Sequence, residues 1–120
     1  MKHYALIFRA TRRLTPEDRE QLFPDIHVWV KQVIEMGITL DPRALGDAET
    51  HLSLEGDTVV SREEEIGLTP ITFVIFFDSE SRDQAMEIAR IHPALRYGTT
   101  IEVRDWMSGR QADANQESLP

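Results

Sequence analysis

Residues 71–106, ITFVIFFDSESRDQAMEIARIHPALRYGTTIEVRDW, decide the fold class of this protein. The segment ITFVIFF (71–77) places apolar side chains on both faces of a strand, which is typical of a central strand covered on both sides. Ser81 with a glutamine three residues later forms a capping-box pattern, which predicts a helix that ends before Pro93. The segment IEVR (101–104) alternates apolar and charged residues, as a strand with one apolar face does. The stretch therefore predicts a strand, a helix and a second strand.

The first half of the chain predicts the same succession of elements. HYALIFRA (3–10) alternates as a strand, and TPED (15–18) supplies a Thr N-cap, a Pro at the first helical position and an Asp for a capping box. The helix that begins there is expected to end at Gly37, because glycine readily adopts the positive φ of a helix C-terminus. Pro24 predicts either a kink in this helix or a short lead-in helix followed by a main one, and we favour the kink. ITLDPRAL (38–45) is expected to be a weak edge strand.

A hairpin interrupts this order before the central strand. THLSLEGDTVVS (50–61) alternates into and out of the turn Glu55-Gly56-Asp57, and such a turn needs glycine for its positive φ. We therefore expect a projecting arm at about 48–61. The charged segment REEEIGLTP (62–70) is expected to be a loop.

The complete order of elements is the ferredoxin-like βαββαβ pattern of an α+β fold, with an added hairpin. We expect residues 1–106 to form this single domain, with helices on one face of an antiparallel sheet, and residues 107–120 to be a disordered tail. The other face of the sheet would expose Val74 and Phe76 to water. We therefore expect that face to pack against the same face of a second subunit, which forms a homodimeric α+β barrel.

The composition excludes several classes of function. The chain of 120 residues has 13 basic and 21 acidic residues and a net charge of -8, which argues against nucleic-acid binding. No apolar run approaches the roughly 20 residues of a membrane span. The start, MKHYALIFRATRR, places its arginines after the apolar stretch and shows no cleavage site, so we expect a cytoplasmic protein.

The absence of cysteine removes thiol nucleophiles and thiolate metal sites. The four histidines show no pair at the spacing of zinc enzymes, and no glycine-rich phosphate loop is present. The sequence therefore predicts neither a metal site nor a cofactor. Any chemistry must come from His, carboxylates or Arg.

The C-terminal stretch 71–106 resembles the end of the YCII-related, or DGPF-domain, family, with its apolar strand, Ser-capped helix, Pro, Gly and IEVR. WVKQVIEMGITL (29–40) resembles the first helix of that family and the strand after it. The resemblance implies a dimeric ferredoxin-like barrel with one cleft per subunit. It also implies a family of largely uncharacterised proteins whose few enzymes act on small organic acids or lactones. The namesake Asp-Gly-Pro-Phe is absent, since the chain reads REEEIG (62–67) at that place.

The open face of the predicted sheet would carry Arg9, Glu102 and Arg104 into the dimer cleft. Guanidinium groups bind carboxylates bidentately, and a neighbouring Arg keeps a Glu ionised. We therefore expect a small anionic organic ligand there, with Trp106 as a cleft wall or a dimer contact. The alternative is that the three charged residues form ordinary cross-strand ion pairs.

His27 and Glu102 are the candidate groups for proton transfer. A histidine titrates near neutral pH, and some members of the resembled family carry a His on the first helix that pairs with an Asp. His27 lies about one residue out of that register, and it also fits a histidine at the boundary of an amphipathic helix. His92 fits a cationic group at a helix C-terminus, where the helix dipole favours it, while His3 and His51 belong to no motif.

Two functions are consistent with these residues. The first is a small enzyme of the isomerase or lyase type that holds an anionic organic molecule in the barrel cleft. The alternative is a non-catalytic module, which binds a ligand in the same cleft or another protein through the hairpin arm. The fold does not choose between them, because this architecture hosts unrelated functions.

Overall fold

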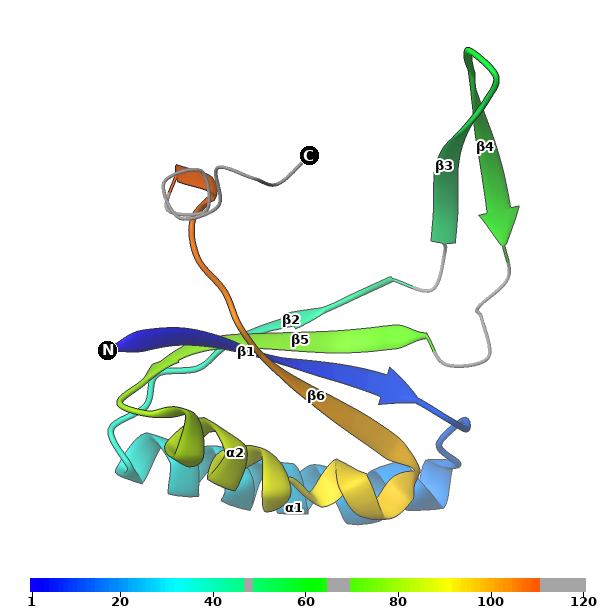
Figure 1. Ribbon diagram of the computed structural model, residues 1–120. Coiled ribbons are helices and arrows are strands. Elements are labelled where there is room, and N and C mark those ends of the chain that lie inside the picture. Colours follow the sequence, from blue (N-terminus) through cyan, green and yellow to red (C-terminus); the bar gives the residue numbers. More distant parts are fainter. Residues whose placement is uncertain (47–48, 65–69, 111–120) are drawn as a thin grey trace.

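Two α-helices cover one face of a four-stranded antiparallel sheet, and a two-stranded hairpin stands apart from both layers (Figure 1). The computed structural model describes residues 1–46, 49–64 and 70–110. In chain order the elements are β1 (Lys2–Ala10), α1 (Pro16–Glu35), β2 (Asp41–Ala44), β3 (Glu49–Glu55), β4 (Thr58–Glu64), β5 (Ile71–Ser79), α2 (Arg82–Arg90), the 3-10 helix η1 (Pro93–Tyr97) and β6 (Thr99–Asp105). The strand order is β2-β5-β1-β6, with β3 and β4 paired on their own. This α+β arrangement is compatible with the predicted ferredoxin-like fold.

The start of α1 follows from its first residues. The backbone N–H of Asp18 donates to Thr15 Oγ1 at 3.1 Å, and the backbone N–H of Thr15 donates to Asp18 Oδ2 at 3.0 Å. This reciprocal pair is the predicted capping box. Pro24 lies within a single α-helix that continues to Glu35, so no separate lead-in helix forms. Gly37 adopts a φ of 85° directly after it, as predicted for the stop.

The core lies between the helices and the inner face of the sheet. Trp29 is 2% exposed, and its Nε1 donates to the carbonyl oxygen of Ile88 at 2.8 Å, which joins α1 to α2. The sheet contributes alternate residues of its two central strands, as the period of a strand requires. The main buried cluster consists of Tyr4, Leu6, Phe8, Trp29, Val33, Ile38, Ile75, Phe77, Ala85, Ile88 and Ala89.

Two strand boundaries differ from the prediction. β2 covers only Asp41–Ala44, and Ile38 is instead a buried residue whose N–H donates to Val33 O at 3.3 Å in the last turn of α1. β4 continues to Glu64, so the first part of the predicted loop 62–70 is strand. Residues 65–69 of that loop and 111–120 of the predicted tail lie outside the described residues.

The hairpin β3–β4 projects on the side of the sheet opposite the helices (Figure 1). Leu54 pairs with Val59 and Glu55 with Thr58, so the loop between the strands contains two residues. Gly56 occupies the first loop position with a φ of 61°. Glycine is favoured there because the tight turns that suit hairpin twist require positive φ.

Candidate functional site

The structure brings together the three charged residues that were predicted to line a cleft. On the face of the sheet away from the helices, Arg104 Nη1 lies 3.3 Å from Glu102 Oε2, and Arg9 Nη2 lies 3.7 Å from Glu102 Oε1. The side chains of Arg9, Glu102 and Arg104 are 39%, 40% and 66% exposed. Such exposed pairs contribute little to stability, but two guanidinium groups on one carboxylate leave donors available to an anion.

A histidine and a carboxylate meet at the other end of this open face. His3 Nδ1 lies 2.5 Å from Asp78 Oδ1, because β1 and β5 pair these two residues directly. The ring of Trp106 stacks on His3 at a centroid distance of 4.5 Å, and its Nε1 donates to the carbonyl oxygen of Tyr4 at 3.0 Å. A histidine held by a carboxylate through one nitrogen can exchange a proton through the other. No sequence pattern indicated a role for His3, since only the pairing of distant strands creates this contact.

His27 does not reach the open face. It is exposed on α1, whereas Glu102 pairs with Ile7, on the face of the sheet opposite the buried Leu6 and Phe8. The reason is helical geometry: Trp29 points into the core, and a residue two positions away is rotated by about 200°. The structure therefore does not bring together the two residues predicted to move a proton.

The described residues form a partly open pocket on the helix side of the sheet. Its volume is about 780 Å³, within the range of small-molecule sites, and its lining is mainly apolar. The sheet contributes Phe8, Phe73 and Ile75. The helix α1 contributes Leu22, Phe23, Ile26, Trp29, Val30 and Ile34. A second apolar stripe on α1, at 23, 26, 30 and 34, was the signal for this pocket in the sequence.

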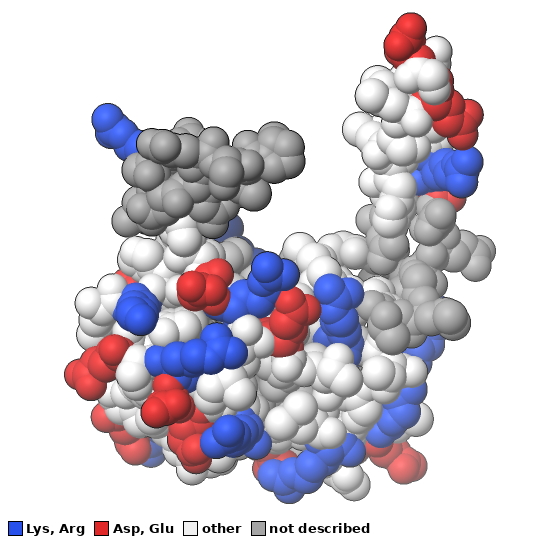
Figure 2. Space-filling view, in the orientation of Figure 1, with Lys and Arg blue, Asp and Glu red and all other residues white. Residues whose placement is uncertain are grey.

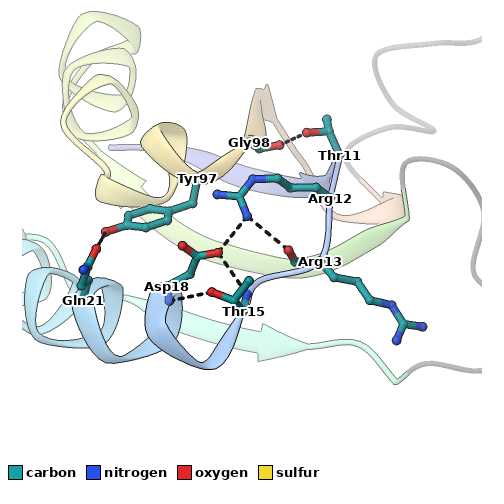
Figure 3. A network of polar contacts seen from close by, with 8 residues as sticks. All are labelled: Thr11, Arg12, Arg13, Thr15, Asp18, Gln21, Tyr97 and Gly98. Atoms are coloured by element: carbon teal, nitrogen blue, oxygen red, sulfur yellow. Dashed lines mark hydrogen bonds and ion pairs between the residues drawn. The ribbon is translucent and has the colours of Figure 1, made fainter.

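A polar network holds the loop between β1 and α1 (Figure 3), and Leu14 of this loop lines the pocket. Arg12 Nη1 donates to Asp18 Oδ2 at 2.8 Å, and the Thr11 N–H donates to Gly98 O at 3.1 Å. The hydrogen bond from Arg12 and that from the Thr15 backbone hold the pKa of Asp18 below its ordinary value. Gly98 has a φ of 82°, and a Cβ there would lie 2.9 Å from Thr11 Oγ1, so a larger residue would disturb this contact. The loop between β1 and α1 is thus tied at both of its ends.

The buried polar group of the pocket is His92. It is 6% exposed, and its ring lies edge-on to Phe8 at 4.8 Å and to Trp29 at 4.5 Å. Burial lowers the pKa of His92 to about 4, so the imidazole is neutral at pH 7. The prediction of a cationic group at a helix C-terminus is therefore wrong, because His92 is instead the N-cap of η1 and is surrounded by apolar rings.

The hydrogen bonding of His92 sets its tautomer. Its Nδ1 accepts a hydrogen bond from the Ala94 N–H at 3.0 Å. In a neutral ring the proton must then sit on Nε2, which makes that atom a donor. No described residue accepts from Nε2, although His92 lines the pocket. The pocket therefore holds one buried side-chain donor, His92, among apolar side chains and the hydroxyls of Thr39, Thr72 and Thr99.

Other classes of site are not formed by the described part of the chain. In residues 1–46, 49–64 and 70–110, no three His, Asp or Glu side chains gather in a way that could hold a metal ion. Neither of the described α-helices has the length and apolar character needed to cross a bilayer. No protein-family model matches the chain, and no characterised protein matches its sequence.

Proposed function

We propose that this protein binds a small, largely apolar organic molecule with a neutral hydrogen-bond acceptor in the pocket between α1 and the sheet. The observation that carries the proposal is an apolar pocket of about 780 Å³ lined by one buried, neutral imidazole. Apolar walls favour the ligand through the hydrophobic effect, and a single polar group fixes its orientation. His92 Nε2 is that group.

The chemistry of the pocket favours a ketone, ester or lactone over a carboxylate. None of the described residues that line it is Arg or Lys. A carboxylate that entered would lose its water without gaining a cationic partner, which costs several kcal/mol. A neutral carbonyl loses much less and gains the hydrogen bond from His92. The ligand proposed here therefore differs from the anion predicted for the open face.

Three probes of one shape test this selectivity: 2-acetylnaphthalene, 2-ethylnaphthalene and 2-naphthoate. We expect the ketone to bind about 5 to 10 times more tightly than the hydrocarbon, because a net hydrogen bond contributes about 1 kcal/mol. The naphthoate should bind most weakly. Isothermal titration calorimetry and the fluorescence of Trp29, which lines the pocket, report binding. His92→Phe should remove the preference for the ketone while retaining binding of the hydrocarbon.

Two Trp substitutions on α1 locate the binding site. Val30 is half-buried and lines the pocket, whereas Val28 is 56% exposed and is not among the lining residues. Val30→Trp should fill the space and abolish binding of 2-acetylnaphthalene. Val28→Trp adds the same ring to the outer side of the helix and should leave binding unchanged. Equal affinities of the ketone for both variants would show that the pocket is not the site.

We propose as a second function that the open face binds a small anionic organic molecule, as an isomerase- or lyase-type enzyme would. Its support is the gathering of Arg9, Glu102 and Arg104 on the same face as the His3 and Asp78 pair. In an enzyme of this type, Arg104 would bind a carboxylate of the substrate. His3, rather than the predicted His27, would transfer the proton. A non-catalytic binding module would use Arg104 in the same way.

Malonate is the probe for this second function. We expect it to shift the amide resonances of β1 and β6 in NMR titrations, and Arg104→Ala to weaken its binding at least threefold. Arg43 is the matched control, because it lies on the edge strand of the same face and its side chain is also 66% exposed. If Arg43→Ala and Arg104→Ala have equal effects, malonate senses only the general charge of the surface.

The predicted dimer and the relationship to the YCII-related family also remain proposals. The open face carries an apolar strip of Ile7, Val74 and Phe76, each of which is only partly buried in the subunit. Packing of two such strips would remove this surface from water, as in a barrel of two sheets. The strand order β2-β5-β1-β6 is compatible with that assembly.

A further inference from the structure

The arm β3–β4 has one apolar and one polar face. Leu52, Leu54 and Val59 lie on the same face, because Leu54 pairs with Val59 and strand residues two positions apart share a side. They are 69%, 68% and 64% exposed. On the other face Arg62 Nη2 lies 3.2 Å from Glu55 Oε1. A two-stranded hairpin in water is only marginally stable, so the apolar face requires a partner.

The position of the arm indicates what kind of partner can cover it. The arm projects on the side of the sheet that the helices leave open (Figure 1). The apolar strip of Ile7, Val74 and Phe76 lies on that same side. A body that covers the strip therefore lies next to the arm.

The length of the arm fits a second sheet and the layer behind it. Each of its strands contains 7 residues, which span about 23 Å at roughly 3.3 Å per residue. Stacked sheets are about 10 Å apart. An arm of this length is long enough to pass the edge of a second sheet on the open face and to reach the helices that cover that sheet.

The arm carries more acidic than basic side chains. The described part of the arm carries acidic Glu55, Asp57 and Glu63 against the single basic Arg62. Figure 2 shows the arm as largely uncharged, with more acidic than basic side chains on it, and basic side chains spread among acidic ones over the body of the subunit. A second copy of the chain brings its own basic residues to the acidic arm. In a symmetric pair each arm makes this same contact with the body of the other subunit.

We propose that the apolar face of the arm packs against a second copy of this chain, so that each subunit of a symmetric dimer clasps the other. The inference rests on the proposed dimer of open faces and adds a second contact to it. One partner then covers both unpartnered apolar surfaces. The dimer is held at two separate places, the strip and the arms.

Sedimentation equilibrium of the full chain tests the two contacts separately. Leu54→Glu places a charge on the apolar face of the arm, and Ser53→Glu places the same charge on its other face, one residue away. We expect Leu54→Glu to raise the dissociation constant of the dimer at least tenfold, and Ser53→Glu to change it less than twofold. Both residues lie outside the core cluster, so the circular dichroism spectrum of each folded variant should match the wild type.

Val74→Glu tests the strip, because the new carboxylate would be buried between the sheets. If Val74→Glu separates the subunits and Leu54→Glu does not, the arm is not a clasp and the dimer of open faces stands. If Leu54→Glu and Ser53→Glu weaken the dimer equally, the apolar face is not the contact. Leu52→Ser, which adds no charge, should weaken the dimer as well. If the wild-type protein is monomeric at a concentration of about 0.1 mM, at which even a weak dimer would form, both proposals are overturned.

Discussion

Trp29→Ala is expected to lower the free energy of unfolding by about 3 to 5 kcal/mol. The indole of Trp29 is 2% exposed, and the substitution leaves a cavity that the surrounding helices and sheet only partly fill. It also removes the donor that bonds the carbonyl oxygen of Ile88 at 2.8 Å, so a buried acceptor loses its partner. This is a large share of the stability of a domain of this size. Urea denaturation followed by circular dichroism measures the loss.

Two further variants separate the causes of that loss. Trp29→Phe keeps an aromatic ring in the core and removes the hydrogen bond with only part of the indole volume, so we expect a smaller loss of about 1 to 2 kcal/mol. Trp106→Ala removes an indole that is 39% exposed, and its effect should be the smallest of the three. A loss below about 1.5 kcal/mol for Trp29→Ala would show that this contact does not anchor α1.

His92→Asn is expected to flatten the dependence of stability on pH between about 4 and 6.5. The pKa of His92 is about 4 in the folded protein, because burial disfavours the cation, whereas an unfolded His titrates near 6.5. Between these values the unfolded chain binds more protons than the folded one, so stability falls as the pH falls. The difference between the folded and unfolded pKa corresponds to about 3 kcal/mol of stability. This stability is fully present above pH 6.5 and is lost as the pH falls to 4.

Asparagine is the informative replacement because its side-chain oxygen can still accept the hydrogen bond from the Ala94 N–H. The measurement is the slope of the unfolding free energy against pH, which a constant loss of packing does not change. His27→Asn is the matched control, because it makes the same replacement at an exposed histidine on α1. If the His92→Asn and wild-type curves stay parallel from pH 7.5 to 4, the imidazole is not buried as a neutral group.

The elements themselves could be predicted because their causes are local. The Thr15 capping box and the stop at Gly37 depend on hydrogen bonds and φ angles within a few residues of each end of α1. The alternation of β1 and β6 likewise follows from the period of a strand. The glycine of the hairpin turn allowed the position of the arm in the chain to be predicted. These features also implied the α+β class and the open face that carries Arg9, Glu102 and Arg104.

The boundaries of β2 could not be predicted from the same rules. ITLDPRAL has strand propensity from residue 38, but Ile38 instead closes the last turn of α1 and is buried in the core. Packing against the helices and the sheet overrode the local preference at this residue. The distance of His27 from the face that carries Glu102 has a related cause. The sequence places His27 on α1, but only the packing of α1 decides which face of the sheet this helix covers.

The sequence by itself determined the helices, the strands, the hairpin and the charge of the open face, since each arises from neighbours along the chain. Only the tertiary structure decided the contact of His3 with Asp78 and the environment of His92. His3 and Asp78 are 75 positions apart and meet through the register of β1 and β5. The low pKa of His92 comes from burial beside the rings of Phe8 on β1 and Trp29 on α1, which no local pattern reveals. Contacts and electrostatic environments of this kind form between distant segments, so they exist only once the chain has folded.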